Sequence, residues 1–237
     1  LWDSVVRNGI RSFYEGKVIL ISGASGFLGG SLVKALSQIP CSIIRLTREQ
    51  TKLDPTFDPS TTVSKLIDIK GDYGTQETWN NVMGDVDIVF HLAAQTSFYT
   101  SEENQSLDYV SNTLPMIRLL ESCSKHAHSP IVIFAGSTTQ CGLVKKLPII
   151  ETTLDNPITN YDKHKLIAEN ALKAAAKKGD VFGCALRLCS IFGPGAVSSS
   201  KDRSVLNKMI AKAIDQQSIS LYGDGSDLRD FLFIDDV

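Results

Sequence analysis

A tyrosine and a lysine four residues apart lie in a segment with helical character. Tyr161 and Lys165 occupy positions i and i+4, which are neighbours on one face of a helix. A phenol with an ordinary pKa of about 10 is a poor acid–base group at neutral pH, and an adjacent ammonium favours its phenolate form. Such a pair also occurs on many surface helices without any chemical role, so other residues must support the interpretation.

Two hydroxyl side chains follow the apolar run 131–135. Ser137 and Thr138 come directly after this predicted strand, at the carboxyl edge where open parallel sheets bind their ligands. With Tyr161 they are suited to hydrogen-bond an alcohol or a carbonyl while a hydride moves to or from the same carbon. The alternative is a serine–threonine loop that only caps a strand.

A glycine-rich turn joins the first predicted strand to a helix. Gly23, Gly26 and Gly29 are spaced three apart, which suits a tight turn, a close approach of backbone to a pyrophosphate and close packing of helix on strand. Free N–H groups at the start of the helix would face the anion. The sequence therefore predicts a dinucleotide phosphate site, with a ligand-free turn as the alternative.

The residues after the second predicted strand favour NADP(H). An acidic residue usually binds the ribose 2′-hydroxyl of NAD(H) at this place, but none occurs between Ile43 and Arg48. Arg48, beside Thr47, can bind a 2′-phosphate through charge-assisted hydrogen bonds. NAD(H) stays open, because the alternative is that Arg45 and Arg48 are solvated charges at a strand end.

Alternating strand-like and helix-like runs are expected to hold these residues in place. We predict an α/β fold, a Rossmann-type doubly wound parallel sheet of about seven strands. The predicted strands are 17–22, 42–46, 65–67, 87–92, 131–135 and 183–188. The predicted helices are 27–37, 75–83, 104–126 and 161–177.

The chain is predicted to have three parts. Residues 1–16 form a short helical extension, residues 17–193 the NAD(P)-binding domain, and residues 194–237 the start of a smaller substrate domain. The second boundary rests on a change in amino-acid composition after Gly193, where Pro194 and the serine run 198–200 suggest a loop. The chain is expected to be truncated, because Asp235 and Asp236 would normally cap a further helix.

Composition excludes several classes of protein. The net charge of −2 gives no basic surplus for nucleic acid, and no apolar run reaches the roughly 20 residues of a membrane span. The five cysteines lack metal-ligand spacing, so we predict no metal and buried free thiols in a cytoplasmic protein. His91 and His164 are interpreted as a strand-end residue and an exposed helix residue without a role.

Taken together, the motifs resemble a known family. The glycine turn, His91-Leu92-Ala93-Ala94, Ser137, Tyr161 to Lys165 and Phe192-Gly193-Pro194-Gly195 are similar in order and spacing to the extended short-chain dehydrogenases, the NAD-dependent epimerase/dehydratase family. The stretch from Gly223 to Val237 is similar to that of sugar-nucleotide enzymes in that family. The resemblance implies a nucleoside-diphosphate sugar as substrate.

The resemblance also implies roles for single residues. Ser137 would bind the carbonyl, Tyr161 would be the acid–base group, and Lys165 would tune it and contact the ribose. Asp68 and Ile69 would border the adenine, Leu92 and Ala93 would line the cofactor cleft, and Asn112 would support the site. The implied cofactor-binding set is Gly23, Ser25, Gly26, Phe27, Leu28, Gly29, Thr47, Arg48, Asp68, Ile69, Leu92, Ala93, Ala94, Asn112, Tyr161 and Lys165. The implied substrate-binding set is Ser137, Thr138, Ser190 and Arg229, the last for the diphosphate.

Departures from the family pattern narrow the expected reaction. Thr138 and Thr139 stand where sugar dehydratases carry an acidic pair, which argues against dehydration. Cys141 replaces a tyrosine, and Ser190 an asparagine, of many epimerases. The segments 134–140 and 160–163 are similar to deoxysugar 4-ketoreductases, which consume NADPH.

Three functions are therefore considered. The first is reduction of a 4-keto-6-deoxyhexose nucleotide by NADPH, with Tyr161 as proton donor. The second is a 4-epimerase that keeps its NAD bound, and the third is a cofactor-sensing protein without catalysis, which the intact Ser137, Tyr161 and Lys165 set opposes. The family resemblance also implies a homodimer formed through helices 104–126 and 161–177.

Overall fold

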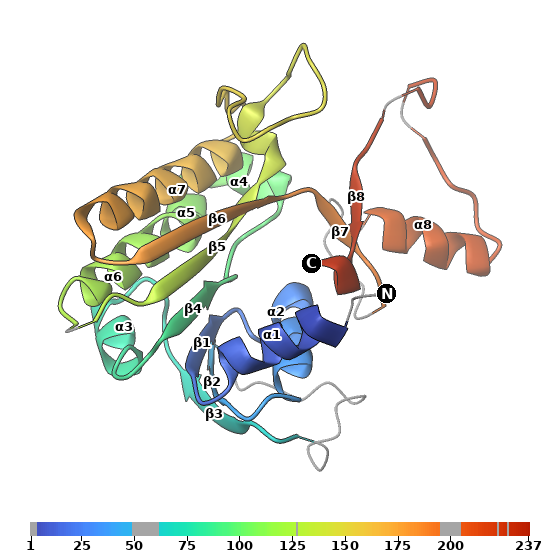
Figure 1. Ribbon diagram of the computed structural model, residues 1–237. Coiled ribbons are helices and arrows are strands. Elements are labelled where there is room, and N and C mark those ends of the chain that lie inside the picture. Colours follow the sequence, from blue (N-terminus) through green and yellow to red (C-terminus); the bar gives the residue numbers. More distant parts are fainter. Residues whose placement is uncertain (1–3, 49–61, 127, 195–204, 222, 227) are drawn as a thin grey trace.

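The computed structural model describes residues 4–48, 62–126, 128–194, 205–221, 223–226 and 228–237. Its main feature is a parallel sheet of six strands in the order β3-β2-β1-β4-β5-β6 (Figure 1). The strands are β1 (Val18–Ser22), β2 (Ser42–Thr47), β3 (Lys65–Lys70), β4 (Ile88–His91), β5 (Ile131–Ser137) and β6 (Phe182–Leu188). The predicted Rossmann-type fold is thus confirmed, with six strands rather than about seven in the described part of this sheet.

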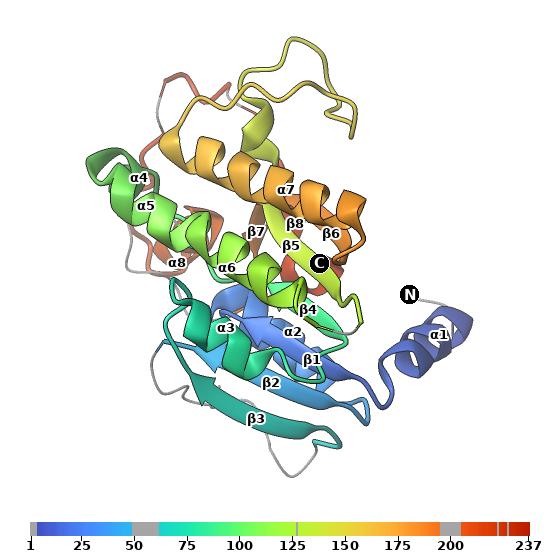
Figure 2. The same ribbon diagram turned by 90° about the vertical axis from the view of Figure 1, so that its left-hand side faces the viewer.

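Helices cover both faces of the sheet, as Figures 1 and 2 show. They are α2 (Phe27–Leu36), α3 (Gln76–Val82), α4 (Phe98–Glu103), α5 (Gln105–Asn112), α6 (Leu114–Cys123) and α7 (Asn160–Lys178). Alternate residues of β1 enter different cores: Leu20 packs with α3, α6 and α7, whereas Ile19 and Ile21 pack with α2. Continuous apolar strands are required because both faces are buried.

The predicted long helix 104–126 is wrong in one respect. The segment forms two helices, α5 and α6, which meet at Thr113. Pro115 lies in the first turn of α6, where its missing N–H costs nothing, whereas inside a continuous helix it would remove a hydrogen bond and clash with the preceding turn.

The two ends of the chain form smaller elements. The predicted amino-terminal helix is α1 (Ser4–Tyr14), and the Tyr14 ring lies 6.4 Å from that of Phe90. At the other end, β7 (Ser190–Phe192) pairs with β8 (Phe231–Phe233), beside α8 (Val205–Ile214) and the short turn η3 (Ile234–Asp236). Gly195 and the serine run 198–200 lie outside the described residues. No helix in the described ranges has the length and apolarity that a membrane crossing needs.

The prediction of buried thiols holds for three of the five cysteines. Cys41, Cys123 and Cys141 are buried, but Cys184 is exposed and Cys189 is half-buried. The last two lie on and just after β6, which is an edge strand among the described residues, so that one side of this segment lacks a covering neighbour.

Candidate active site

The glycine turn forms an open cradle at the carboxyl end of β1. Gly23 has φ +73°, and a Cβ at this position would lie 2.8 Å from Ala93 N. Gly26 is the N-cap of α2 and offers no side chain to its first N–H groups, which an α-helix leaves without internal partners. A pyrophosphate fits this arrangement, because it can accept hydrogen bonds from these groups and gains from the helix dipole.

Gly29 is the tightest point of this cradle and gives a direct test. A Cβ on Gly29 would lie 2.2 Å from Gly23 O, a backbone atom that cannot move without distorting the turn. We expect Gly29→Ala to lower dinucleotide affinity by at least about tenfold, measured by fluorescence titration. Gly84→Ala, where a Cβ meets nothing within 4 Å, is the matched control. Unchanged binding by Gly29→Ala would contradict this account of the turn.

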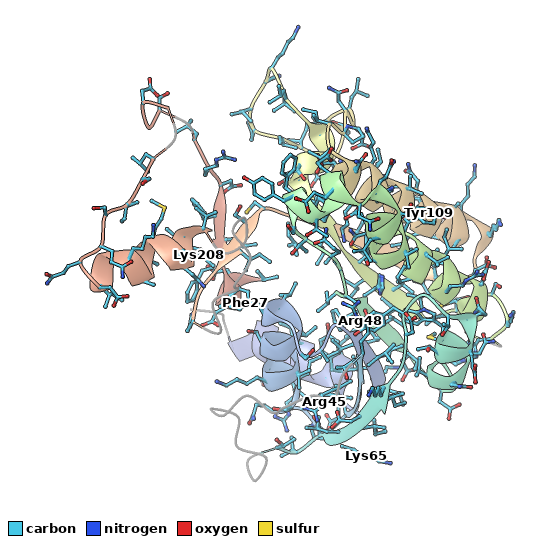
Figure 3. The ribbon with its side chains drawn as sticks, turned by 180° about the vertical axis from the view of Figure 1, so that it is seen from behind. Phe27, Arg45, Arg48, Lys65, Tyr109 and Lys208 are labelled. Atoms are coloured by element: carbon cyan, nitrogen blue, oxygen red, sulfur yellow. The ribbon has the colours of Figure 1, made fainter. Side chains whose placement is uncertain are left out.

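Arg48 stands over a hollow of about 380 Å³ beside the turn, here termed the Arg48 hollow. It is lined by Gly23, Ser25, Gly26, Arg48, Tyr73, Leu92, Ala93 and Ala94. Figure 3 shows Phe27 and Arg48 at the same end of the sheet. The Arg48 guanidinium lies 5.8 Å from the Tyr73 ring centroid, so an aromatic face helps to hold the cation in place.

Tyr73 is a residue of this hollow that the sequence did not reveal. Its hydroxyl donates to Leu46 O at 2.9 Å and accepts from Gly23 N–H at 3.2 Å, thereby joining the end of β2 to the glycine turn. Burial raises the pKa of the Tyr73 phenol, against the opposing effect of the Gly23 N–H bond. A single tyrosine in a loop after β3 carries no motif that would have identified it.

Arg45 is not the solvated strand-end charge considered above. It is buried and donates to both carboxylate oxygens of Asp68, from Nε and Nη2, each at 2.6 Å. The parallel register places Arg45 directly opposite Asp68. Neither Asp68 nor Ile69 is among the residues that line the Arg48 hollow, so their adenine contact stays a prediction.

The loop after β4 is held in place by a buried amide. Asn112 Oδ1 accepts from Gln95 N at 3.1 Å, and Asn112 Nδ2 donates to Gln95 O at 2.9 Å. This double hydrogen bond fixes the segment that carries Leu92 and Ala94 into the hollows. The structure thus gives Asn112 a supporting position behind the loop.

The three predicted catalytic residues share one hollow of about 530 Å³, here termed the central hollow. Ser137, Tyr161 and Lys165 line it together with the glycine turn, Leu92, Ala94 and Ser190. Ser137 ends β5, whereas Tyr161 and Lys165 lie in the first turns of α7. The sheet edge and the helix therefore bring together groups that lie more than twenty residues apart in the sequence.

Lys165 is a buried cation with little solvation. It is 2% exposed, and its Nζ lies 4.1 Å from the centroid of the Phe134 ring. Burial lowers the pKa of Lys165 to about 7, opposed by the carboxylates of Asp108 and Glu169. A lysine near this pKa can take up or release a proton at neutral pH, which suits an acid–base site.

A buried polar cluster next to Ser137 was not predicted from the sequence. Gln140 Oε1 accepts from Ser137 N at 3.0 Å, and Gln140 Nε2 donates to Glu169 Oε2 at 2.8 Å. Arg187 donates to both oxygens of Glu169, from Nε at 3.0 Å and Nη2 at 2.8 Å. Burial raises the pKa of Glu169, but hydrogen bonds from Arg187, Lys173 and Gln140 together outweigh it and lower the pKa to about 2. The cluster ties the Ser137 turn to α7 and β6.

The predicted substrate residues lie in different places. Ser190 lines the central hollow. Thr138 lines a neighbouring hollow of about 1120 Å³ with Arg187 and Asp230. Arg229 is exposed just before β8. The structure therefore joins only Ser137 and Ser190 of this set in one hollow.

His164 is buried, contrary to its interpretation as an exposed helix residue. Its Nδ1 lies 2.6 Å from Oδ2 of Asp108, which is fully buried in α5, and its carbonyl accepts from Thr113 Oγ1 at 3.0 Å. The error arose because α7 packs against both the sheet and α5, so that two sides of the helix are covered. His91 is also buried, with its Nδ1 2.8 Å from Ser22 Oγ, and burial lowers its pKa to about 3, so it is neutral.

A comparison with protein families decides the assignment of the chain. The profile described as "NAD dependent epimerase/dehydratase family" matches residues 19–237. The chain belongs to this family. It is accordingly an enzyme of an NAD-dependent family, with the Rossmann-type sheet and glycine turn described above.

Individual relatives in this epimerase/dehydratase family cover most of the chain. A protein of Methanocaldococcus jannaschii named "Putative UDP-glucose 4-epimerase" is 28% identical over 93% of this chain and 70% of its own length. The UDP-N-acetylglucosamine 4-epimerase of Methanobrevibacter ruminantium, solved with UDP-N-acetylmuramic acid, is 27% identical, with a TM-score of 0.82 over 93% of this chain and 70% of that one. MoeE5, solved with UDP-glucose and NAD, is 29% identical, with a TM-score of 0.72 over 93% and 68% of the respective chains.

Proposed function

We propose that this chain is the cofactor-binding and catalytic part of a UDP-sugar 4-epimerase, the second of the functions considered above. The observation that carries the proposal is the central hollow, in which Ser137, Tyr161 and Lys165 meet the phosphate-binding turn. The relatives reported above are named 4-epimerases or bind UDP-sugars, which supports this function over the 4-ketoreductase favoured by the sequence.

Different residues of this chain are proposed to transfer the proton, to stabilise the phenolate and to bind the substrate. Bound NAD supplies the acceptor and donor for a hydride. Tyr161 takes the proton of the sugar hydroxyl and later returns it, while Lys165 stabilises the phenolate by its charge. Ser137 binds the sugar oxygen. Arg229 is proposed to hold the diphosphate.

A cofactor balance tests this proposal. The natural full-length protein is incubated with UDP-glucose, and the sugar nucleotides are separated by chromatography. Interconversion of the two 4-epimers with tightly held NAD and no net cofactor consumption supports the epimerase. Stoichiometric oxidation of NADPH by a 4-keto-6-deoxy sugar nucleotide, without epimer interconversion, would overturn it.

The second candidate function is the NADPH-dependent 4-ketoreductase. Two observations favour it: Cys141 is buried where many epimerases carry a tyrosine, and Arg48 reaches the Arg48 hollow, where the cation can bind a 2′-phosphate. Arg45 is not available for this purpose, because its charge is paired with Asp68. The preference for NADP(H) therefore depends on Arg48.

Replacing Arg48 tests whether this residue distinguishes NADPH from NADH. We expect Arg48→Ala to weaken NADPH binding about tenfold and to change NADH binding by less than about twofold, because a charge-assisted hydrogen bond to the phosphate is lost. Fluorescence titration measures both affinities. Lys65→Ala removes a charge at the start of β3 and serves as the control. Equal losses for both cofactors would show that Arg48 does not recognise the 2′-phosphate.

We also propose a homodimer through α4, α5 and α7. These helices contact one another and expose large apolar side chains: Phe98, Tyr99, Leu107, Tyr109, Val110 and Ile167. Exposed apolar side chains gathered on neighbouring helices favour association. Light scattering is expected to give a dimer, and Val110→Glu, which adds a charge to this surface, is expected to shift it toward monomer. A wild-type monomer at micromolar concentration would contradict the proposal.

A further inference from the structure

The hydroxyl of Ser137 is connected to a buried carboxylate by a second hydroxyl. Ser137 Oγ lies 2.7 Å from Thr139 Oγ1 and accepts from Thr139 N at 3.3 Å. Thr139 Oγ1 donates to Asp162 Oδ1 at 2.5 Å. Asp162 is 4% exposed and directly follows Tyr161. The three side chains thus form one hydrogen-bonded chain that begins at the central hollow.

Asp162 determines which hydroxyl donates to which in this series of hydrogen bonds. Its Oδ2 accepts from Thr159 N at 3.2 Å, so both carboxylate oxygens face donors. Asp162 lies in the first turn of α7, where the helix dipole favours a negative charge. An ionised carboxylate only accepts hydrogen bonds. The single proton of Thr139 is therefore committed to Asp162, and Ser137 must donate its own proton to Thr139.

Toward the central hollow, Ser137 can only accept a hydrogen bond. A serine hydroxyl has one proton and two lone pairs; the proton faces Thr139 Oγ1 and one lone pair takes the Thr139 N–H. A lone pair remains for the central hollow. We propose that Asp162, acting through Thr139, makes Ser137 a hydrogen-bond acceptor, so that the site selects a sugar with a hydroxyl rather than a carbonyl at the reacting carbon.

This inference rests on the proposed nucleotide-sugar substrate and specifies its oxidation state. Both substrates of a 4-epimerase arrive as alcohols, whose O–H can donate to Ser137. The substrate of a 4-ketoreductase arrives as a ketone, which only accepts. An alcohol has only one proton to donate. Its O–H points to Ser137 on binding and turns to Tyr161 for the step in which Tyr161 takes the proton. Thr139 and Asp162 are positioning residues that determine specificity.

The binding test compares UDP-glucose with its 4-deoxy-4-fluoro analogue. Fluorine cannot donate a hydrogen bond, so the analogue lacks the interaction that an accepting Ser137 requires. Calorimetry on the natural full-length protein in a Tyr161→Phe background, which prevents turnover, is expected to show about tenfold weaker binding of the analogue, as for the loss of one buried hydrogen bond.

The Asp162→Asn variant is expected to reverse the direction of the hydrogen bonds between residue 162, Thr139 and Ser137. Thr159 N–H needs an acceptor, so the amide oxygen of this variant faces Thr159 and its NH₂ group faces Thr139. Thr139 then donates to Ser137, whose proton is released toward the hollow. The preference for UDP-glucose over the analogue should fall to within about twofold. Thr139→Val, which removes the hydroxyl but keeps the N–H, should have the same effect, and Thr139→Ser should keep the tenfold preference.

The controls separate this role from helix capping. Thr75→Val removes the N-cap side chain of α3, which is not among the residues that line the central hollow, and should lower the melting temperature without changing the ratio of affinities. A tenfold preference that persists in Asp162→Asn and Thr139→Val would overturn the inference, as would equal binding of the two ligands by the Tyr161→Phe parent. If the parent binds neither ligand, the proposed UDP-sugar substrate fails, and the inference fails with it.

Discussion

Replacing Tyr161 by phenylalanine is expected to lower kcat by about 10³-fold, within the range that general acid–base groups contribute. The ring that lines the central hollow is kept, but the group that would take and return the proton is lost. KM is expected to change little, since the substrate still meets Ser137 and the other residues that line the hollow. Steady-state rates of epimer interconversion measure both constants.

Tyr14→Phe is the matched control for this substitution. Tyr14 lies at the end of α1, its ring is 6.4 Å from that of Phe90, and it is not among the residues that line the central hollow. We expect wild-type kcat for this variant. If Tyr161→Phe keeps more than about a tenth of the wild-type rate, another group moves the proton and the proposed assignment of Tyr161 fails.

The sheet could be predicted because its strands have a strong local signal. The run from Val18 to Ser22 is apolar at nearly every position, as a strand covered on both faces must be, and the glycine turn follows at once. The break between α5 and α6 was also visible in principle, because Pro115 disfavours a continuous helix. That signal was outweighed by the apolar periodicity on either side of it.

The site was predictable only where a motif marks it. Tyr161, Lys165 and Ser137 carry a known spacing, and the fold brings them to one hollow. Arg45 was misjudged because its partner, Asp68, is defined by strand register and not by sequence distance. The Thr139–Asp162 bond has the same origin, since it joins the turn after β5 to α7. Of these contacts, only the capping box of Thr159 and Asp162 has a spacing that can be recognised in the sequence.

Replacing Lys165 by methionine is expected to lower kcat by at least about 10²-fold while leaving the fold intact. The ammonium that favours the Tyr161 phenolate is lost, so fewer molecules hold Tyr161 in its active form at neutral pH. Methionine has a similar length and fits against the Phe134 ring. The neighbouring carboxylates keep other partners, since Asp108 faces His164 and Glu169 faces Arg187.

The same Lys165→Met substitution is expected to raise stability by about 2 kcal/mol, because it removes a buried charge whose desolvation is only partly offset. Since burial lowers the pKa of Lys165 from 10.5 to about 7, the folded protein releases a proton that the unfolded chain still holds between these two values. Wild-type stability should therefore rise with pH from about 7 toward 10.5. In Lys165→Met this contribution should vanish, as urea unfolding at several pH values can measure. A Lys165→Met protein less stable than wild type at pH 7 would show that Asp108 and Glu169 more than compensate for the burial of this lysine, and that its charge stabilises the fold as well as the phenolate.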